Sequence, residues 1–449
     1  MSLDLSAFKR ELEARDIDIV RVMYCDVLGI PRSKDMLVSQ IERSMEHGPA
    51  FCQGVWFTTT RGGVNDGKGS ASDGLPDLIT RADLATAHDA PWEPGVCYVI
   101  ADSFNADGSE SEIAPRSVLR RVVAQFAELG LTPIMGPELE FYLADQTEEG
   151  TWKRAINKTG RVYMTGSLVD PDGIFLEMLR DLDEFGIGVF AGNHEFSPSQ
   201  YEINIWHSDA LDAADRTFFL KAGIKEMAAQ MGMLATFLGK PWNDEGGSGY
   251  HLHFSVNDAS GTNVMAQGND LTDVARYMIG GLLKHADAVS AFSNPTVNAF
   301  KRLGPDTLAP YRKNWGYDNR TTMVRIPPER GAGARLELRV GDGAANPYVI
   351  AAAVLAAALD GVRNKIEPPA ASESWSYADE SSPTLPETFS DALDALEAND
   401  AIKDVLGSVF VETFLTMKRD EIERYSAEVS DASTREVTQW ELDEYLLDY

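Results

Sequence analysis

The segments Gly136-Pro-Glu-Leu-Glu-Phe-Tyr142 and Arg335-Leu-Glu-Leu-Arg339 are apolar and strand-like, with charged residues two apart. Because residues i and i+2 of a strand share a face, Glu138 lies beside Glu140, and Glu337 lies between two arginines. Charges on a buried sheet face are costly unless they are compensated. A divalent metal with a phosphorylated substrate would compensate them, so the two segments predict a sheet that carries an ionic site.

Composition limits the class of protein. The 449 residues exceed the roughly 250–300 at which single hydrophobic cores stop growing, so we expect at least two domains. The hydrophobic fraction of 44% is sufficient for such cores. The formal net charge of −30 leaves no basic stripe to displace counterions, which argues against a nucleic-acid partner. The acidic surface favours solubility, and a high-salt habitat is an alternative reason for it.

The cellular compartment is indicated by the cysteines and by the apolar runs. Cys25, Cys52 and Cys97 have no metal-binding spacing and are typical of reduced thiols in a cytosolic protein. The amino terminus has no signal-peptide pattern. The longest apolar run, residues 349–359, is shorter than the roughly 20 residues that span a bilayer. We therefore expect a cytoplasmic protein with no membrane partner.

Hydrophobic periodicity and turn residues divide the chain. Residues 1–110 are predicted to form a small mixed α+β domain, with 105–111 as the linker, and residues 111–449 a larger catalytic domain. Asn346-Pro347 suits a helix start, since Asn caps helices and Pro favours the first helical position. No internal repeat is found. The predicted helices are residues 7–15, 37–46, 117–129, 170–185, 212–233 and 271–292, with more after 388, and the predicted strands include 17–24, 51–58 and 96–101.

A second acidic pair, Glu195 and Glu202, lies seven residues apart. On one continuous strand the two side chains would face opposite sides. Pro198 interrupts the strand, so a bend there would let both carboxylates point to one site.

A third cluster follows a glycine-rich turn. His251, His253 and Ser255 alternate with apolar residues and so share one face of a strand. A single histidine in such a place usually belongs to the core, but two of them beyond a turn that permits close backbone approach favour a ligand site. The glycines of this turn are Gly246, Gly247 and Gly249.

The fourth cluster consists of arginines in an otherwise acidic chain. Their strand spacing predicts clamps for phosphate or carboxylate, which guanidinium groups bind in a bidentate manner. They are Arg302, Arg320, Arg325, Arg335 and Arg339.

Together the four clusters indicate a class of chemistry. Carboxylates with few imidazoles favour Mg²⁺ or Mn²⁺ over zinc. Such ions with arginines suit phosphoryl transfer from ATP, where positioning and charge neutralisation provide most of the catalysis. The sequence has neither a P-loop nor a Rossmann fingerprint.

In this order, the clusters resemble those of the glutamine synthetase family, and the resemblance covers essentially the whole chain. It implies an α+β fold: a small β-grasp domain, then a catalytic domain with a curved antiparallel sheet and packed helices. It also implies a homo-oligomer, a dodecamer of two hexameric rings, in which the amino-terminal domain of one subunit closes the active site of the next.

The resemblance implies roles residue by residue. One metal is held by Glu140, Glu195 and Glu202, the other by Glu138, His251 and Glu337, with about two to three ions per site. Nucleotide-binding positions are matched by His253, Ser255, Arg320, Arg325 and Arg335. Glutamate-binding positions are matched by Gly247, Arg302 and Arg339. Arg320 and Arg339 are the catalytic residues: ATP phosphorylates the glutamate γ-carboxylate, and an amine then attacks the acyl phosphate.

The chain departs from the family where ammonium binds. Two carboxylates of the family's ammonium pocket are matched here by Gln53 and Leu308, while the pocket tyrosine is retained as Tyr163. Each lost charge contact is worth about 1.5–3 kcal/mol. With Trp56 nearby in sequence, the changed pocket predicts room for an apolar amine substituent. Gly246 replaces an Asn that contacts the glutamate amino group in the family.

We therefore predict an ATP-dependent ligase that joins glutamate to an organic primary amine. A polyamine, ethanolamine or another alkyl or aromatic amine is compatible, with a monoamine favoured by Leu308 and Trp56. The alternatives are a glutamine synthetase that uses ammonium, or a non-catalytic ring. The latter disagrees with six metal-ligand positions that are all occupied by Glu or His.

Overall fold

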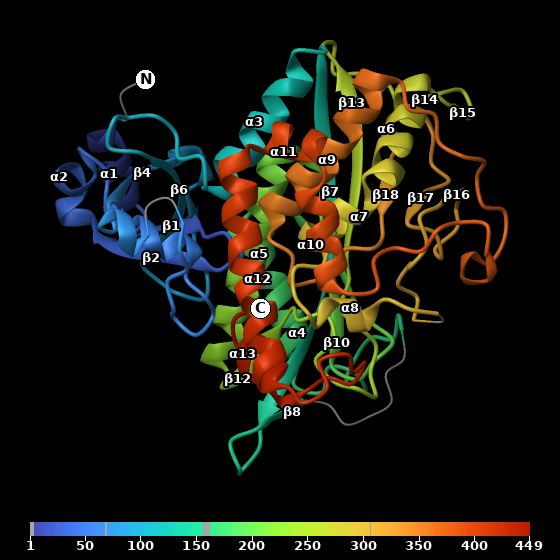
Figure 1. Ribbon diagram of the computed structural model, residues 1–449. Helices are drawn as coiled ribbons and strands as arrows, with labels where there is room; N and C mark the ends of the chain where they lie inside the picture. The colour runs from blue at the N-terminus through green and yellow to red at the C-terminus, as the bar shows by residue number, and fades with distance from the viewer. Residues whose placement is uncertain (1–3, 68–69, 156–161, 306) are drawn as a thin grey trace.

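A six-stranded sheet organises the amino-terminal part of the chain, drawn in blue in Figure 1. The computed structural model describes residues 4–67, 70–155, 162–305 and 307–449. The strand order is β2-β1-β6-β4-β3, with β5 also paired to β6, and only β1 and β6 run parallel. The strands are β1 (Ile19–Cys25), β2 (Pro31–Leu37), β3 (Ala50–Cys52), β4 (Asp77–Ala82), β5 (His88–Asp89) and β6 (Val96–Phe104).

Two helices pack on this sheet near their predicted positions. α1 (Leu5–Glu13) is capped by the Asp4 side chain and buries Phe8 and Leu12, and a 3₁₀ turn leads into α2 (Ile41–Met45). The strand predicted for 51–58 is wrong beyond Cys52, because Gln53–Phe57 form a 3₁₀ helix. This turn directs Trp56 inward to stack on Tyr24, and its burial outweighs the local strand propensity.

A ten-stranded sheet organises the rest of the chain. Its main path is β16-β17-β18-β13-β7-β10-β9, antiparallel except between β16 and β17. The long β7 also pairs with β8, β11 and β12. The bounds are β7 (Leu131–Gln146), β8 (Trp152–Arg154), β9 (Val189–His194), β10 (Gln200–Ile205), β11 (Ser208–Asp209), β12 (Met233–Thr236), β13 (Tyr250–Asp258), β16 (Trp315–Tyr317), β17 (Val324–Ile326) and β18 (Leu336–Leu338). A separate hairpin joins β14 (Ala266–Gln267) and β15 (Asp270–Leu271).

Helices cover this sheet around the buried α9 (Pro347–Asn364), whose start at Asn346-Pro347 is confirmed by the Asn346 side-chain cap. The others are α3 (Pro115–Ala127), α4 (Ile174–Phe185), α5 (Ala210–Gln230), α6 (Asp273–Lys284), α7 (Ala286–Ser293), α8 (Ala299–Arg302), α10 (Phe389–Glu397), α11 (Asp400–Leu406), α12 (Ser408–Glu428) and α13 (Gln439–Tyr445). Two predicted helices differ. The helix expected from 170 begins at Ile174, because Gly173 is left-handed, and the helix expected over 271–292 is divided at His285.

The two sheets are joined by a buried ionic network. Arg116 of α3 pairs with Asp102 of β6 and Asp83, and on its other side with Asp215 of α5. The Tyr348 hydroxyl also donates to Asp215. We keep the boundary between residues 110 and 111 as a proposed division of domains. Within the described ranges, no helix has the length and apolar character needed to cross a bilayer.

Candidate active site

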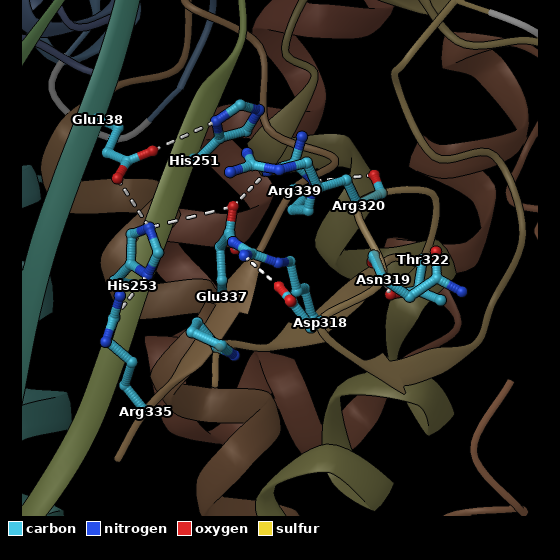
Figure 2. Close-up of polar contacts among 12 residues, drawn as sticks. Glu138, His251, His253, Asp318, Asn319, Arg320, Thr322, Arg335, Glu337 and Arg339 are labelled. Carbon is cyan, nitrogen blue, oxygen red and sulfur yellow. Dashed lines mark hydrogen bonds and ion pairs between the residues drawn. The ribbon is translucent and has the colours of Figure 1, made fainter. Parts of the chain in front are cut away.

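Strand register brings the predicted carboxylates onto one face of the larger sheet. Glu202 of β10 stands directly opposite Glu140 of β7, and His251 of β13 stands opposite Glu138. On the next strand, Glu337 of β18 stands opposite His253. Figure 2 shows the side chains of Glu138, His251, His253 and Glu337 pointing toward one another.

Two groups of side chains have the spacing of metal ligands. In Glu138, His251 and Glu337, and again in Glu140, Glu202 and His251, one ligand atom per residue lies within 4.8 Å of the others. The first group is the predicted one. The second differs from the prediction, because His251 completes it where Glu195 was expected.

Glu195 reaches the same cavity through a tight turn between β9 and β10. The Glu195 N–H donates to the Gln200 carbonyl at 2.8 Å, and Ser199 has a φ of 62°. The chain therefore reverses around Pro198, and Glu195 and Glu202 line one cavity, as the predicted bend required.

Neutral amide groups that the sequence prediction missed support the carboxylates. Asn193 donates to Glu195 at 2.9 Å and Asn204 donates to Glu202 at 3.1 Å. Glu140 accepts from the Gly249 N–H at 2.8 Å and from Gln200 at 3.3 Å. Strand spacing could have identified these asparagines from the sequence, because each lies two residues from the glutamate that it contacts.

Two of the carboxylates are held ionised. Burial opposes the charge of Glu138, but hydrogen bonds with His251 and His253 keep its pKa well below the usual range. Burial also opposes the charge of Glu337, yet Arg339 lowers its pKa to about 2. His253 Nε2 lies 3.0 Å from a Glu138 carboxylate oxygen, and His253 Nδ1 accepts from Arg335 at 3.0 Å.

Two further carboxylates have surroundings that disfavour their charged form. Burial and the charge of Glu140 raise the pKa of Glu195 to about 7. Burial and the charges of Glu138, Glu140 and Glu195 raise the pKa of Glu202 to about 9. Such a crowded set is relieved by a divalent cation, and carboxylates with one imidazole are ligands that suit Mg²⁺ or Mn²⁺. The donor set therefore fits the implied metals.

Two adjoining cavities meet at this face. One, of about 660 Å³, is lined by all the carboxylates described except Glu337, together with the five predicted arginines. The other, of about 650 Å³, is lined by Ser255, and His253 and Arg335 border both. Phe190 and Trp206, half-exposed and stacked at 4.3 Å, stand at its wall. An ionic cavity beside a partly aromatic one suits a nucleotide, with phosphates in the first and a base in the second.

The relatives of the chain agree with this geometry. The family described as "Glutamine synthetase, catalytic domain" matches residues 112–445. Glutamine synthetase of Pyrococcus horikoshii is 36% identical over 451 residues, covering 97% of each chain. The Halobacterium salinarum glutamine synthetase is 33% identical, covering 97% of this chain and 95% of its own. This chain belongs to the glutamine synthetase family.

Solved structures of the family have the same fold. A structure described as the GmaS/ADP complex, conformation 1, has a TM-score of 0.84 and 31% identity, covering 98% of each chain. A structure described as apo GmaS has a TM-score of 0.83. The predicted α+β fold with a curved sheet and packed helices is thereby confirmed, and the chain is an ATP-dependent ligase of the glutamine synthetase family.

In this family member the arginines have different surroundings. Arg325 donates to Glu337 at 2.7 Å and to Asp318 at 2.6 Å. Arg339 pairs with Glu337 and donates to the Arg320 carbonyl at 3.0 Å (Figure 2). The Arg320 side chain is exposed. Arg320 is therefore the predicted arginine most open to the cavity.

Arg302 is buried beside the glycine-rich turn. Its Nη2 donates to the Val340 and Gly341 carbonyls at 2.7 and 2.6 Å, and its Nε has no hydrogen-bond partner among the described residues. A Cβ at Gly247 would stand 2.3 Å from the Arg302 Cγ, so this approach requires glycine. Two of the three predicted glutamate-binding positions, Gly247 and Arg302, are thus in contact.

The four residues predicted for the amine pocket separate into two pairs. Tyr163 and Leu308 line the carboxylate cavity. Trp56 is 0% exposed and stacks on Tyr24 at 3.9 Å, so it has no surface to offer a substrate, and its assignment was wrong. Gln53 is 8% exposed and lines neither cavity of its own chain.

Proposed function

We propose that this protein joins the γ-carboxylate of L-glutamate to an organic primary amine, using ATP and passing through γ-glutamyl phosphate. One observation carries the proposal. Leu308, an apolar residue where the family resemblance places a carboxylate for ammonium, lines the cavity that holds the carboxylates and arginines. A site without that carboxylate loses both a cation contact and a proton acceptor for ammonium.

The metal ligands are proposed from the two geometric groups. Glu138, His251 and Glu337 hold one ion, and Glu140 and Glu202, with Glu195 at the same cavity and His251 between the groups, hold the other. When bound, these ions supply neutralisation of the phosphate charge. Asn193 and Asn204 orient the carboxylates of Glu195 and Glu202 through their hydrogen bonds.

In the first step, a γ-carboxylate oxygen of glutamate attacks the γ-phosphorus of ATP, and the bond from that phosphorus to ADP breaks. Arg302 and Gly247 position the glutamate, and the exposed guanidinium of Arg320 meets the developing charge. Arg339 acts beside it, because its Nε fixes the Arg320 backbone. His253, Ser255, Arg325 and Arg335 are the proposed nucleotide contacts.

In the second step, the amine nitrogen attacks the acyl carbon and phosphate leaves. Tyr163 and Leu308 border the cavity where this amine arrives. We further propose a dodecamer of two hexameric rings, in which Gln53 reaches the site from a neighbouring subunit. The structure described as an ADP complex supports the nucleotide assignment.

A second candidate is glutamine synthetase proper. It is favoured by the printed name of the Pyrococcus horikoshii relative, at 36% identity over nearly the whole chain. The two functions differ only in the nitrogen nucleophile.

The test is phosphate release with ATP, Mg²⁺ and glutamate across a panel of primary amines and ammonium. We expect turnover with at least one amine to exceed turnover with ammonium by about tenfold or more, the loss expected for one charge contact. Robust turnover with ammonium, equal to that with the best amine, would overturn the proposal.

A further inference from the structure

Besides Phe190, which stacks on Trp206, three large exposed apolar side chains line the ionic cavity. Tyr163 is 68% exposed, Phe196 57% and Leu308 44%, and all three line the cavity with the carboxylates and arginines. We call them the apolar collar. Single exposed apolar residues are ordinary, but three around one cavity are typical of a ligand-binding surface. Phe196 played no part in the sequence prediction.

The backbone places the collar close to the carboxylates. Phe196 directly follows Glu195, and the Tyr163 N–H donates to the carbonyl of His194 at 2.9 Å. Tyr163 and Leu308 have φ values of 63° and 62°, a left-handed conformation that is costly for residues with a Cβ. Both residues therefore line the cavity in a backbone conformation that is unfavourable for them.

Two tyrosines, Tyr311 and Tyr377, fix the chain next to Leu308 through hydrogen bonds. The Tyr377 hydroxyl donates to the Ala309 carbonyl at 3.3 Å, and the Tyr311 hydroxyl donates to the Tyr377 carbonyl at 3.0 Å. The two rings stack 5.6 Å apart with an interplanar angle of 9°. The backbone immediately after Leu308 is thus anchored, which fixes the position of Leu308 at the cavity.

The charges of the cavity limit which amine fits. Its described carboxylates are Glu138, Glu140, Glu195, Glu202 and Glu329. The first four belong to the proposed metal-binding set, and Glu329 pairs with Arg335 at 3.1 Å. Among the described lining residues, none is left to receive a second ammonium group. A diamine would have to bury its distal charge without a carboxylate partner from this chain, which is costly.

We propose that the amine substrate is a short-chain primary alkyl monoamine whose alkyl group is covered by the apolar collar, with Phe196 as a specificity-determining residue. This inference rests on the proposed function and narrows the predicted amines, because it disfavours polyamines. The alkylammonium ion loses two protons as its nitrogen forms the amide bond and the acyl C–O bond to phosphate breaks. One proton is carried away on monohydrogen phosphate and the other is released to solvent.

The experiment compares methylamine, ethylamine, propylamine, butylamine and 1,4-diaminobutane in the phosphate-release assay. In the wild type, kcat/KM should rise about fourfold for each methylene that the collar covers. Butylamine should exceed 1,4-diaminobutane by about tenfold or more, because the second ammonium loses water without a partner. Equal use of the diamine, or no dependence on chain length, would overturn the inference.

Phe196→Ala should flatten the chain-length dependence and raise KM for the amine, while KM for ATP and glutamate stays unchanged. Leu176→Ala is the matched control, since Leu176 is an exposed apolar residue of α4 that lines neither cavity. Phe196→Leu, which keeps apolar area, should retain part of the dependence. If the alanine variant fails to fold, the leucine variant and the wild-type amine series still test whether the collar covers the alkyl group.

A competing reading is that Phe196 is covered by a second copy of the chain. In that case Phe196→Ala changes the mass of the assembly in light scattering and leaves the chain-length dependence intact, which contradicts the inference. Failure of the proposed function is distinguishable, because then ammonium alone is turned over and every member of the amine series is inert.

Discussion

At the scale of single residues, chemistry and substrate choice are assigned to different side chains. Glu138, Glu337 and His251 sit on paired strands, where register fixes their distances. Leu308 and Phe196 sit on turns at the edge of the same cavity, where a substitution alters one contact without moving a strand. Amine selectivity is therefore expected to change independently of the phosphoryl chemistry.

Leu308→Glu should move the enzyme toward ammonium. A carboxylate at this position adds a cation contact worth about 1.5–3 kcal/mol, which is about ten- to 150-fold in the ratio of kcat/KM for ammonium to that for an alkylamine. Leu308→Gln, similar in size but uncharged, is the control and should not produce this shift. A ratio that is the same in both variants would show that charge at residue 308 does not select the amine.

Asn204→Ala should weaken metal binding, because it removes the hydrogen bond that orients Glu202. Loss of such an outer partner typically costs about 10–100-fold in metal affinity. Calorimetry with Mn²⁺ alone measures this without any turnover. Asn105→Ala, in a turn of the amino-terminal part, is the control. Unchanged Mn²⁺ affinity in Asn204→Ala would contradict the assigned role of Glu202.

At the scale of elements, strand faces were predictable and strand partners were not. The spacing of two residues correctly placed Glu138 with Glu140, and His251 with His253, because pleating requires it. That His251 serves both metal groups depends on the pairing of β13 with β7, which local sequence does not encode.

The residues predicted for the amine pocket also depended on long-range contacts that local sequence does not encode. Trp56 was misplaced because stacking on Tyr24, a long-range contact, turns it inward. Phe196 was missed because its exposure is set by the β9–β10 turn rather than by its neighbours in sequence.

The packing of β5 on α4 and α5 should be sensitive to acid. His88 contacts the rings of Phe185 and Phe219 at 5.2 and 5.7 Å, and burial lowers its pKa. The unfolded chain then binds a proton that the folded chain resists, so stability falls as pH drops below the ordinary histidine pKa of about 6.5.

Thermal unfolding of the wild type and His88→Gln between pH 7.5 and 5 measures this effect. The variant should lose less stability on acidification. The neighbouring Asp89, Asp212 and Arg216 are present in both proteins, so the difference reports His88. The same pH dependence in both would contradict the prediction.

At the scale of the whole molecule, Arg116 connects the two sheets through three aspartates. Asp215 is buried and accepts from both Arg116 and Tyr348. Removing the cation leaves a buried carboxylate without its ionic partner, the situation in which a buried ion pair matters most.

Arg116→Ala should therefore lower the free energy of unfolding by about 3–5 kcal/mol. Arg120→Ala is the comparison, because Arg120 shares Asp102 but is more exposed, and an exposed pair contributes about 1 kcal/mol or less. Denaturant titration of both variants gives the two values. Equal losses would show that burial of the Arg116 network adds nothing.

The protein as a whole carries a formal net charge of −30, yet five arginines line the candidate site. Glutamate and ATP, the proposed substrates, are both anions, and we expect these arginines to offset part of the negative charge of the protein where they bind.

The most direct measurement is a competition between ammonium and butylamine at equal concentration, with ATP, Mg²⁺ and glutamate, and the products identified by mass spectrometry. The proposed function predicts the γ-glutamyl alkylamide as the main product, with release of one phosphate per amide formed. Glutamine as the main product would contradict it.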